Sequence, residues 1–188
     1  MALRRGFKGE ANEIALGIRK ELDLGTSAPL SPWVVAELLD IPVVEMSSLT
    51  NEAASAVFHF SHRSQSAFSG ATVFDGLFRM IVYNDSHTAG RQANDVSHEI
   101  SHALLQHQPG PAIDDLGCRF WDGSIEEEAA YLGGVLLIPQ EAALSIASRG
   151  LTTQAAALEY GVSTKMITYR MSITNARVRV ARGERVRP

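Results

Sequence analysis

The chain carries, at residues 97–107, the stretch SHEISHALLQH, which contains the pattern His-Glu-x-x-His. Apolar residues recur at helical spacing from about Ala89 to Gln106, and Pro109 ends the pattern, so this segment is predicted to be a helix. Residues four apart lie one above the other on a helix, so His98 and His102 can bind one metal ion from the same face. The stretch therefore predicts a metal-binding helix.

Glu99 lies between the two histidines in sequence and about 100° around the helix from His98. This offset keeps Glu99 out of the predicted ligand set but lets its carboxylate reach a water molecule at the metal. Glu99 is therefore the candidate general base. The competing interpretation is that the two histidines are structural residues of an ordinary surface helix.

A catalytic zinc site usually has three protein ligands, so a third must come from another segment. The run Glu126–Glu128 lies in the first turns of a second predicted helix, from about Ser124 to Ile138. An apolar stripe at 132, 135 and 136 continues from Glu128, which predicts that Glu128 faces the protein interior as the third ligand. The alternative is a first-turn carboxylate that only stabilises the helix dipole.

The residue pattern in the rest of the chain predicts helices on both sides of a β-rich region. Ser69-Gly70 is a turn signal between two segments rich in Val, Ile, Phe and Tyr. The predicted elements are helices over 9–22, 32–39, 152–160 and 164–180, extended backbone over 41–45, and strands over 56–61 and 71–84. This order predicts an α+β fold in which a small antiparallel sheet lies beside the two site helices.

Composition limits the class of protein. The 188 residues are 45% hydrophobic and 20% charged, with a net charge of −4, which is typical of one globular domain and excludes a disordered or fibrous chain. Cys118 is the only cysteine, which excludes an intrachain disulfide and a cysteine-based zinc module. Arg4 and Arg5 are not followed by an apolar run, and residues 129–139 are too short to span a bilayer. We therefore expect a cytoplasmic protein with no membrane contact.

Charge is unevenly distributed along the chain. Residues 1–164 contain 10 basic and 20 acidic residues, whereas residues 165–188 contain 7 basic and 1 acidic. Such a basic tail can contact nucleic acid phosphates or an acidic partner, and a solvated chain end accounts for it equally well.

Two blocks of the sequence resemble the ImmA/IrrE family of metallo-endopeptidases. Residues 97–107 are similar to the family pattern A-H-E-L-G-H-x-L-L-x-H, and residues 128–139, EAAYLGGVLLIP, are similar to E-A-N-x-F-A-x-x-L-L-M-P. Weaker similarity at 68–70, 81–84 and 161–163 extends the resemblance over about residues 10–177. The chain differs from the family at Ser101, Ala130 and Leu132-Gly133, and none of these positions is a predicted ligand.

The resemblance implies a zincin-like minidomain over residues 1–150, including the N-terminal helices, and a helix-turn-helix-like segment with a basic tail over 151–188. It also implies that His98, His102 and Glu128 bind zinc and that Glu99 is the catalytic base. Manganese is the alternative metal.

The function implied is a zinc endopeptidase that makes limited cuts in a helix-turn-helix transcriptional repressor and so derepresses stress or mobile-element genes. One alternative is a non-proteolytic antirepressor that binds DNA or a partner and has a structural or silent metal site. The apolar residues of the last helix favour packing over base reading: Met166, Ile167, Tyr169, Met171 and Ile173. Another alternative is a hydrolase of other peptides or amides, because the motif specifies an activated water and not a substrate.

Peptide hydrolysis also needs a group that stabilises the tetrahedral oxyanion. The sequence offers four candidates and does not distinguish them: Tyr131, His107, His62 and Arg119. For Tyr131, core packing is the competing interpretation, and for His107 it is a favourable position at a helix C-terminus.

Overall fold

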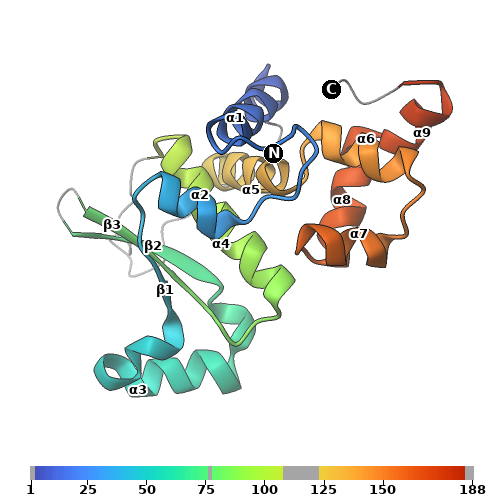
Figure 1. Cartoon of the computed structure of the whole chain (residues 1–188). Coiled ribbons are helices and arrows are strands. Elements are labelled where there is room, and N and C mark those ends of the chain that lie inside the picture. The colour runs from blue at the N-terminus through green and yellow to red at the C-terminus, as the bar shows by residue number, and fades with distance from the viewer. Residues whose placement is uncertain (1–2, 76–77, 108–122, 185–188) are drawn as a thin grey trace.

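The computed structural model describes residues 3–75, 78–107 and 123–184. The helices are α1 (Phe7–Glu21), α2 (Pro32–Leu38), α3 (Thr50–Phe58), α4 (Ala89–Leu104), α5 (Gly123–Leu137), α6 (Gln140–Ser148), α7 (Thr153–Tyr160), α8 (Thr164–Thr174) and α9 (Ala176–Ala181). The strands are β1 (Val43–Glu45), β2 (Gly70–Asp75) and β3 (Phe78–Tyr83). Figure 1 shows the sheet at one end of the molecule, α4 and α5 in the middle and the C-terminal helices at the other end.

The predicted α+β class is confirmed, but the sheet is mixed and not purely antiparallel. Its strand order is β1-β3-β2, with β1 parallel to β3 and β2 antiparallel to β3. The predicted extended segment at 41–45 contains β1, and the predicted strand over 71–84 forms the β2–β3 hairpin.

The strand predicted over residues 56–61 is wrong, because these residues belong to α3 and to the helical turn His59–Arg63 that follows it. Val57 and Phe60 pack into the same small cluster, in which Met46 and Val82 are also buried. Residues three apart share a face on a helix, whereas on a strand they would point to opposite faces. The β-branched and aromatic composition of this segment therefore reflects packing of one helical face against the sheet.

The His-Glu-x-x-His motif lies on α4, which packs closely against α5. A Cβ atom at Gly133 would lie 3.2 Å from the backbone nitrogen of His98 and from the carbonyl oxygen of Ser97. The Ser97 hydroxyl donates a hydrogen bond of 3.0 Å to the Gly133 carbonyl. Only glycine permits such close contact without displacement, so this crossing fixes where His98 lies relative to α5.

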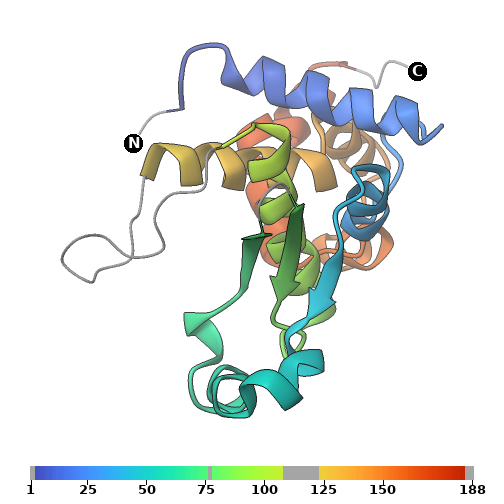
Figure 2. The ribbon, with the colours of Figure 1, turned by 90° about the vertical axis from the view of Figure 1, so that its left-hand side faces the viewer.

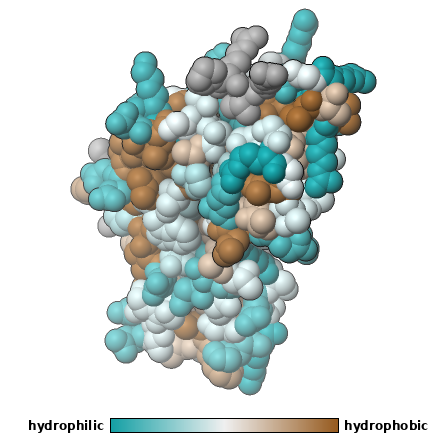
Figure 3. All heavy atoms as spheres, turned by 45° about the vertical axis from the view of Figure 1, so that its right-hand side comes forward, coloured by the Kyte–Doolittle hydropathy of each residue, from teal (hydrophilic) through white to brown (hydrophobic). Residues whose placement is uncertain are grey.

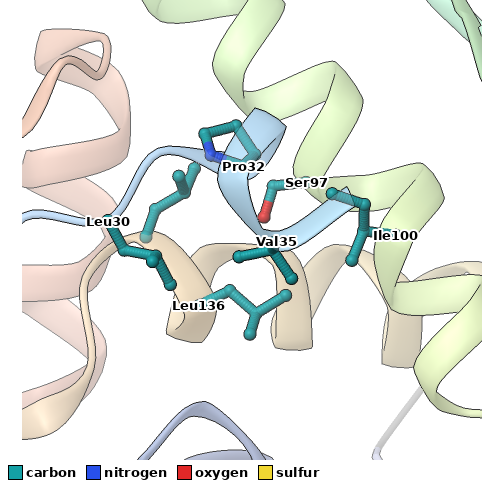
Figure 4. Close-up of a pocket in the computed structure, with 7 residues that line it drawn as sticks. Leu30, Pro32, Val35, Ser97, Ile100 and Leu136 are labelled. Atoms are coloured by element: carbon teal, nitrogen blue, oxygen red, sulfur yellow. The ribbon is translucent and has the colours of Figure 1, made fainter. Parts of the chain in front are cut away.

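The main core surrounds this helix pair. Figure 2 shows α1 lying along α5 on the side away from the sheet. The α2 helix covers α4 and α5, and Figure 4 shows Val35 directed towards Ile100 and Leu136. These residues line an apolar pocket that is too small to admit a water molecule. The core therefore holds the motif helix on a dry, close-packed support.

The C-terminal helices have their own core and dock on α4. Residues from α6, α7, α8 and α9 form a second buried cluster, which includes Leu144, Tyr160 and Ile167. A Cβ atom at Gly90, in the first turn of α4, would lie 2.6 Å from the backbone of Val162 and Ser163 in the α7–α8 turn. The C-terminal segment is thus in direct backbone contact with the helix that carries the His-Glu-x-x-His motif. The domain division at residue 150 stays a prediction.

The helix-turn-helix-like arrangement of α7 and α8 has the predicted turn at Gly161, whose φ is 64°. The single helix predicted over 164–180 is divided, because Asn175 adopts a φ of 52° between α8 and α9. Figure 3, which brings the C-terminal end of the molecule forward, shows apolar patches separated by hydrophilic side chains. The exposed apolar residues of this end include Leu158 and Val178.

No single helix among the described residues is long and apolar enough to cross a membrane. The helices α5 and α6 meet that criterion of length and composition only as a pair bent by 47°.

We predict that Gly90→Ala lowers the free energy of unfolding by about 1–3 kcal/mol, because the added methyl group overlaps the backbone of the α7–α8 turn. Urea unfolding followed by circular dichroism measures the effect. Gly17→Ala is the matched control, because Gly17 is an exposed α1 residue with no atom within 4 Å of its added Cβ. Gly17→Ala should raise stability by up to about 1 kcal/mol. Equal stability of Gly90→Ala and the wild type would contradict the docking of the C-terminal segment.

Candidate metal centre

Two imidazoles and one carboxylate converge between α4 and α5. The Nε2 atoms of His98 and His102 are 3.1 Å apart, and Glu126 Oε2 lies 3.1 Å from His98 Nε2 and 3.8 Å from His102 Nε2. Ligands at the usual zinc distances in a tetrahedral site are about 3.3 Å from one another. The three atoms therefore already have the spacing that one zinc ion requires, and two histidines with one carboxylate form a donor set of catalytic zinc sites.

Helical geometry explains why Glu126 meets the histidines. His98 and His102 are one turn apart on α4, as predicted. Glu126 precedes Gly133 by seven residues, or close to two turns, so both lie on the same face of α5. Gly133 contacts the backbone of His98, and the same face therefore presents Glu126 to the two imidazoles.

Glu128, the predicted third ligand, has other partners in the structure. Its Oε1 atom is 2.9 Å from Arg4 Nε, and its Oε2 atom is 3.9 Å from His107 Nε2. Two residues along a helix correspond to a rotation of about 200°, so Glu128 and Glu126 leave α5 on nearly opposite sides. The structure thus brings Glu126, and not Glu128, to His98 and His102. Ligation by Glu128 stays a prediction.

The apolar stripe in the sequence could not show whether Glu126 or Glu128 lies on the face of α5 that meets α4. Every residue from Tyr131 to Leu137 is buried, because α1 covers one side of this helix and α4 another. Glu128 does continue an apolar stripe, but its side chain meets Arg4, just before α1. A continuous buried segment therefore predicts that the helix is central and leaves the direction of each glutamate open.

Glu99 is outside the ligand cluster, as its position in the motif predicts. Its Oε2 atom accepts a hydrogen bond of 2.7 Å from the Thr72 hydroxyl of β2. Burial raises the pKa of Glu99 above its ordinary value, and the Thr72 hydrogen bond partly opposes this shift. A carboxylate with a raised pKa is a stronger proton acceptor, which suits the predicted role of general base.

The pKa values of the two motif histidines shift in opposite directions. Burial, reinforced by the charge of His98, lowers the pKa of His102 to about 4. Burial also opposes the charge of His98, but its hydrogen bond to Glu126 and the nearby Glu99 raise the His98 pKa above the ordinary value. At neutral pH His102 is therefore the neutral imidazole that binds metals, and a metal at the site must displace any proton that His98 carries.

His107 lies against the metal centre in a position that sequence reasoning missed. Its Nδ1 atom is 3.0 Å from Nδ1 of His102. The α4 helix ends at Leu104, and Gln106 then adopts a φ of 54°, which turns the chain back towards the helix. The periodicity of apolar residues does not show where a residue adopts a left-handed conformation, as Gln106 does. The sequence motif therefore did not predict the contact between His107 and His102.

The other predicted oxyanion donors do not join this cluster in the described residues. The Tyr131 ring is buried against Phe7, with 5.9 Å between ring centroids, as expected for core packing. His62 is exposed and stacks on Phe58. Arg119 and the lone Cys118 lie outside the described residues.

Comparison with known families gives one match. The profile of the IrrE N-terminal-like domain, peptidase family M78, matches residues 36–172. No match was found among the curated proteins or the solved structures. The matched region begins in α2, ends in α8, and contains the sheet and both helices of the metal centre. The chain therefore belongs to the M78 family of IrrE-like peptidases.

Proposed function

We propose that this protein is a zinc-dependent endopeptidase that makes limited cuts in a protein substrate. The observation that carries the proposal is the convergence of His98, His102 and Glu126. The carboxylate of Glu99, the residue after His98, lies outside this cluster and is held by Thr72. The N,N,O donor set fits zinc, and the family match supplies the reaction class.

In the proposed hydrolysis, different residues of the chain have different roles. His98, His102 and Glu126 would hold the zinc ion, which would supply Lewis-acid activation of a water molecule and of the scissile carbonyl. Glu99 accepts the proton of the attacking water and delivers it to the leaving amine. The Thr72 hydroxyl holds the Glu99 carboxylate beside β2, so that it is oriented before substrate binds.

The sheet offers a place for an extended substrate. Among the described strands β2 pairs only with β3, so no other described strand covers its second edge. Thr72 of this strand contacts Glu99, which places the edge close to the proposed base. A peptide that adds to β2 as a further strand would bring its backbone near the metal centre.

The proposed substrate is a helix-turn-helix repressor in the cytoplasm, whose cleavage would release stress or mobile-element genes. This part of the proposal is supported by the resemblance to the ImmA/IrrE family. The acidic excess of residues 1–164 is also compatible with a basic, DNA-binding substrate.

The alternative function, a non-proteolytic antirepressor, is favoured by one observation. In α8, the apolar Met166, Ile167 and Met171 are buried as expected. Tyr169 and Ile173 are not, and they are exposed together with Lys165, Thr168 and Ser172. This exposed, mixed polar and apolar face could meet DNA or a partner. Binding that is unaffected by Glu99→Gln but lost on removal of residues 181–188 would support this function.

We predict that Glu99→Gln lowers the rate of repressor cleavage by at least about 100-fold and leaves zinc content at one ion per chain, because Gln cannot accept the water proton. Mass spectrometry measures the cleavage of candidate repressors, and elemental analysis measures the zinc content. Glu13→Gln, at an exposed position of α1, is the charge-matched control and should cleave normally. Unchanged cleavage by Glu99→Gln would refute the assignment of Glu99 as the base.

We also predict that Glu126→Gln weakens zinc binding by more than about 100-fold, because its carboxylate lies with the two imidazoles. Glu128→Gln should weaken zinc binding by no more than about 10-fold. Competition with a chromogenic chelator gives both affinities. The reverse order of effects would assign the third ligand to Glu128 and refute the cluster seen here.

A further inference from the structure

We propose that His107 is a positioning residue of the metal centre: it accepts a hydrogen bond from Nδ1 of His102 and thereby leaves Nε2 of His102 free to bind the metal. This inference rests on the proposed metal centre but not on the identity of the substrate. It assigns a role to a histidine that the hydrolytic mechanism does not use.

The contact between the two rings has the geometry of a hydrogen bond. The two Nδ1 atoms are 3.0 Å apart, and the rings are tilted by 68° with centroids 5.1 Å apart. Because both atoms are nitrogens, one must carry the proton and the other must accept it. The direction of this bond therefore decides which tautomer of His102 is present.

Only one direction is compatible with a metal at Nε2 of His102. That atom faces His98 Nε2 at 3.1 Å and Glu126 Oε2 at 3.8 Å, so it must carry a lone pair towards the metal. His102 then keeps its proton on Nδ1 and donates it to His107. The opposite direction would place the proton on Nε2 of His102 and block the metal position.

Glu128 favours the productive direction. Its Oε2 atom is 3.9 Å from Nε2 of His107, which is too long for a direct hydrogen bond but places a negative charge beside that nitrogen. The charge favours a proton on Nε2 of His107, which leaves Nδ1 of His107 as the acceptor. The side chains of His107 and Glu128 are only 11% and 16% exposed, so solvent screens this effect weakly.

Two further contacts hold His107 and Glu128 in place. The backbone N–H of His107 donates to the carbonyl of His102 at 3.0 Å, as the chain turns back after α4. Arg4 Nε contacts Glu128 at 2.9 Å, which connects the segment before α1 to the same network. The network thus runs from Arg4 through Glu128 and His107 to the ligand His102.

The test compares His107→Ala, which removes the acceptor, with His107→Asn, whose side-chain oxygen can take the place of Nδ1. His62→Ala is the control for loss of a histidine, because His62 is exposed and stacks on Phe58. Two quantities are measured in the absence of substrate: zinc affinity by chelator competition, and the His102 tautomer in the metal-free protein by ¹⁵N NMR of the imidazole rings at neutral pH.

We expect His107→Ala to weaken zinc binding by about 10–100-fold and to shift His102 from the Nδ1–H to the Nε2–H tautomer. His107→Asn should restore most of the affinity and the Nδ1–H tautomer, and His62→Ala should change neither. The proposal is overturned if the tautomer is unchanged in His107→Ala, or if His107→Asn binds zinc as weakly as His107→Ala. Neither readout uses peptide cleavage, so a failure of the proposed peptidase activity would be seen separately.

Discussion

The close crossing of α4 and α5 at Ser97 and Gly133 is the contact on which the metal centre depends. It brings the backbones of the two helices so near that a single added Cβ atom at Gly133 would lie 3.2 Å from the backbone of His98. At this separation Glu126, two turns before Gly133, reaches the imidazoles of α4 directly. A wider crossing would leave the carboxylate short of a common metal ion, because zinc ligands must lie within about 2 Å of the ion. The site is therefore set by backbone packing before any metal binds.

The central position of α5 imposes a second constraint, since its buried C-terminal carbonyl groups need donors. Two buried arginines provide them: Arg19 of α1 donates to the carbonyl of Leu136, and Arg170 of α8 donates to that of Ile138, each at 2.8 Å. Burial lowers the pKa of Arg19 to about 10, so it remains charged at neutral pH. Positive charge at this end of α5 and the glutamates at the other end both complement the helix dipole. The same bonds attach α1 and the C-terminal segment to the helix that carries Glu126.

Sequence periodicity predicted those features of the site that one helix determines by itself. His98, His102 and Glu99 follow from i, i+4 geometry on a helix whose apolar face is clear, and the structure places all three as the motif implies. The features that depend on contacts between segments were not predictable. The face of Glu128 was ambiguous because α5 is buried on several sides, and the contact of His107 required the left-handed Gln106. The segment 56–61 was misinterpreted because its apolar residues have the composition of a strand but pack as a helix.

The run of glutamates at the start of α5 acquires a physical meaning from these contacts. Glu126 and Glu128 are about 200° apart on the helix, so one carboxylate meets the imidazoles while the other is directed towards Arg4 and His107. The two carboxylates therefore lie beside different histidines: Glu126 contacts His98 directly, and Glu128 lies beside His107, which contacts His102. A single glutamate could not do both, because its side chain leaves the helix in one direction only. In the proposed metal centre, less than one turn of helix thus supplies both a ligand, Glu126, and the carboxylate beside His107.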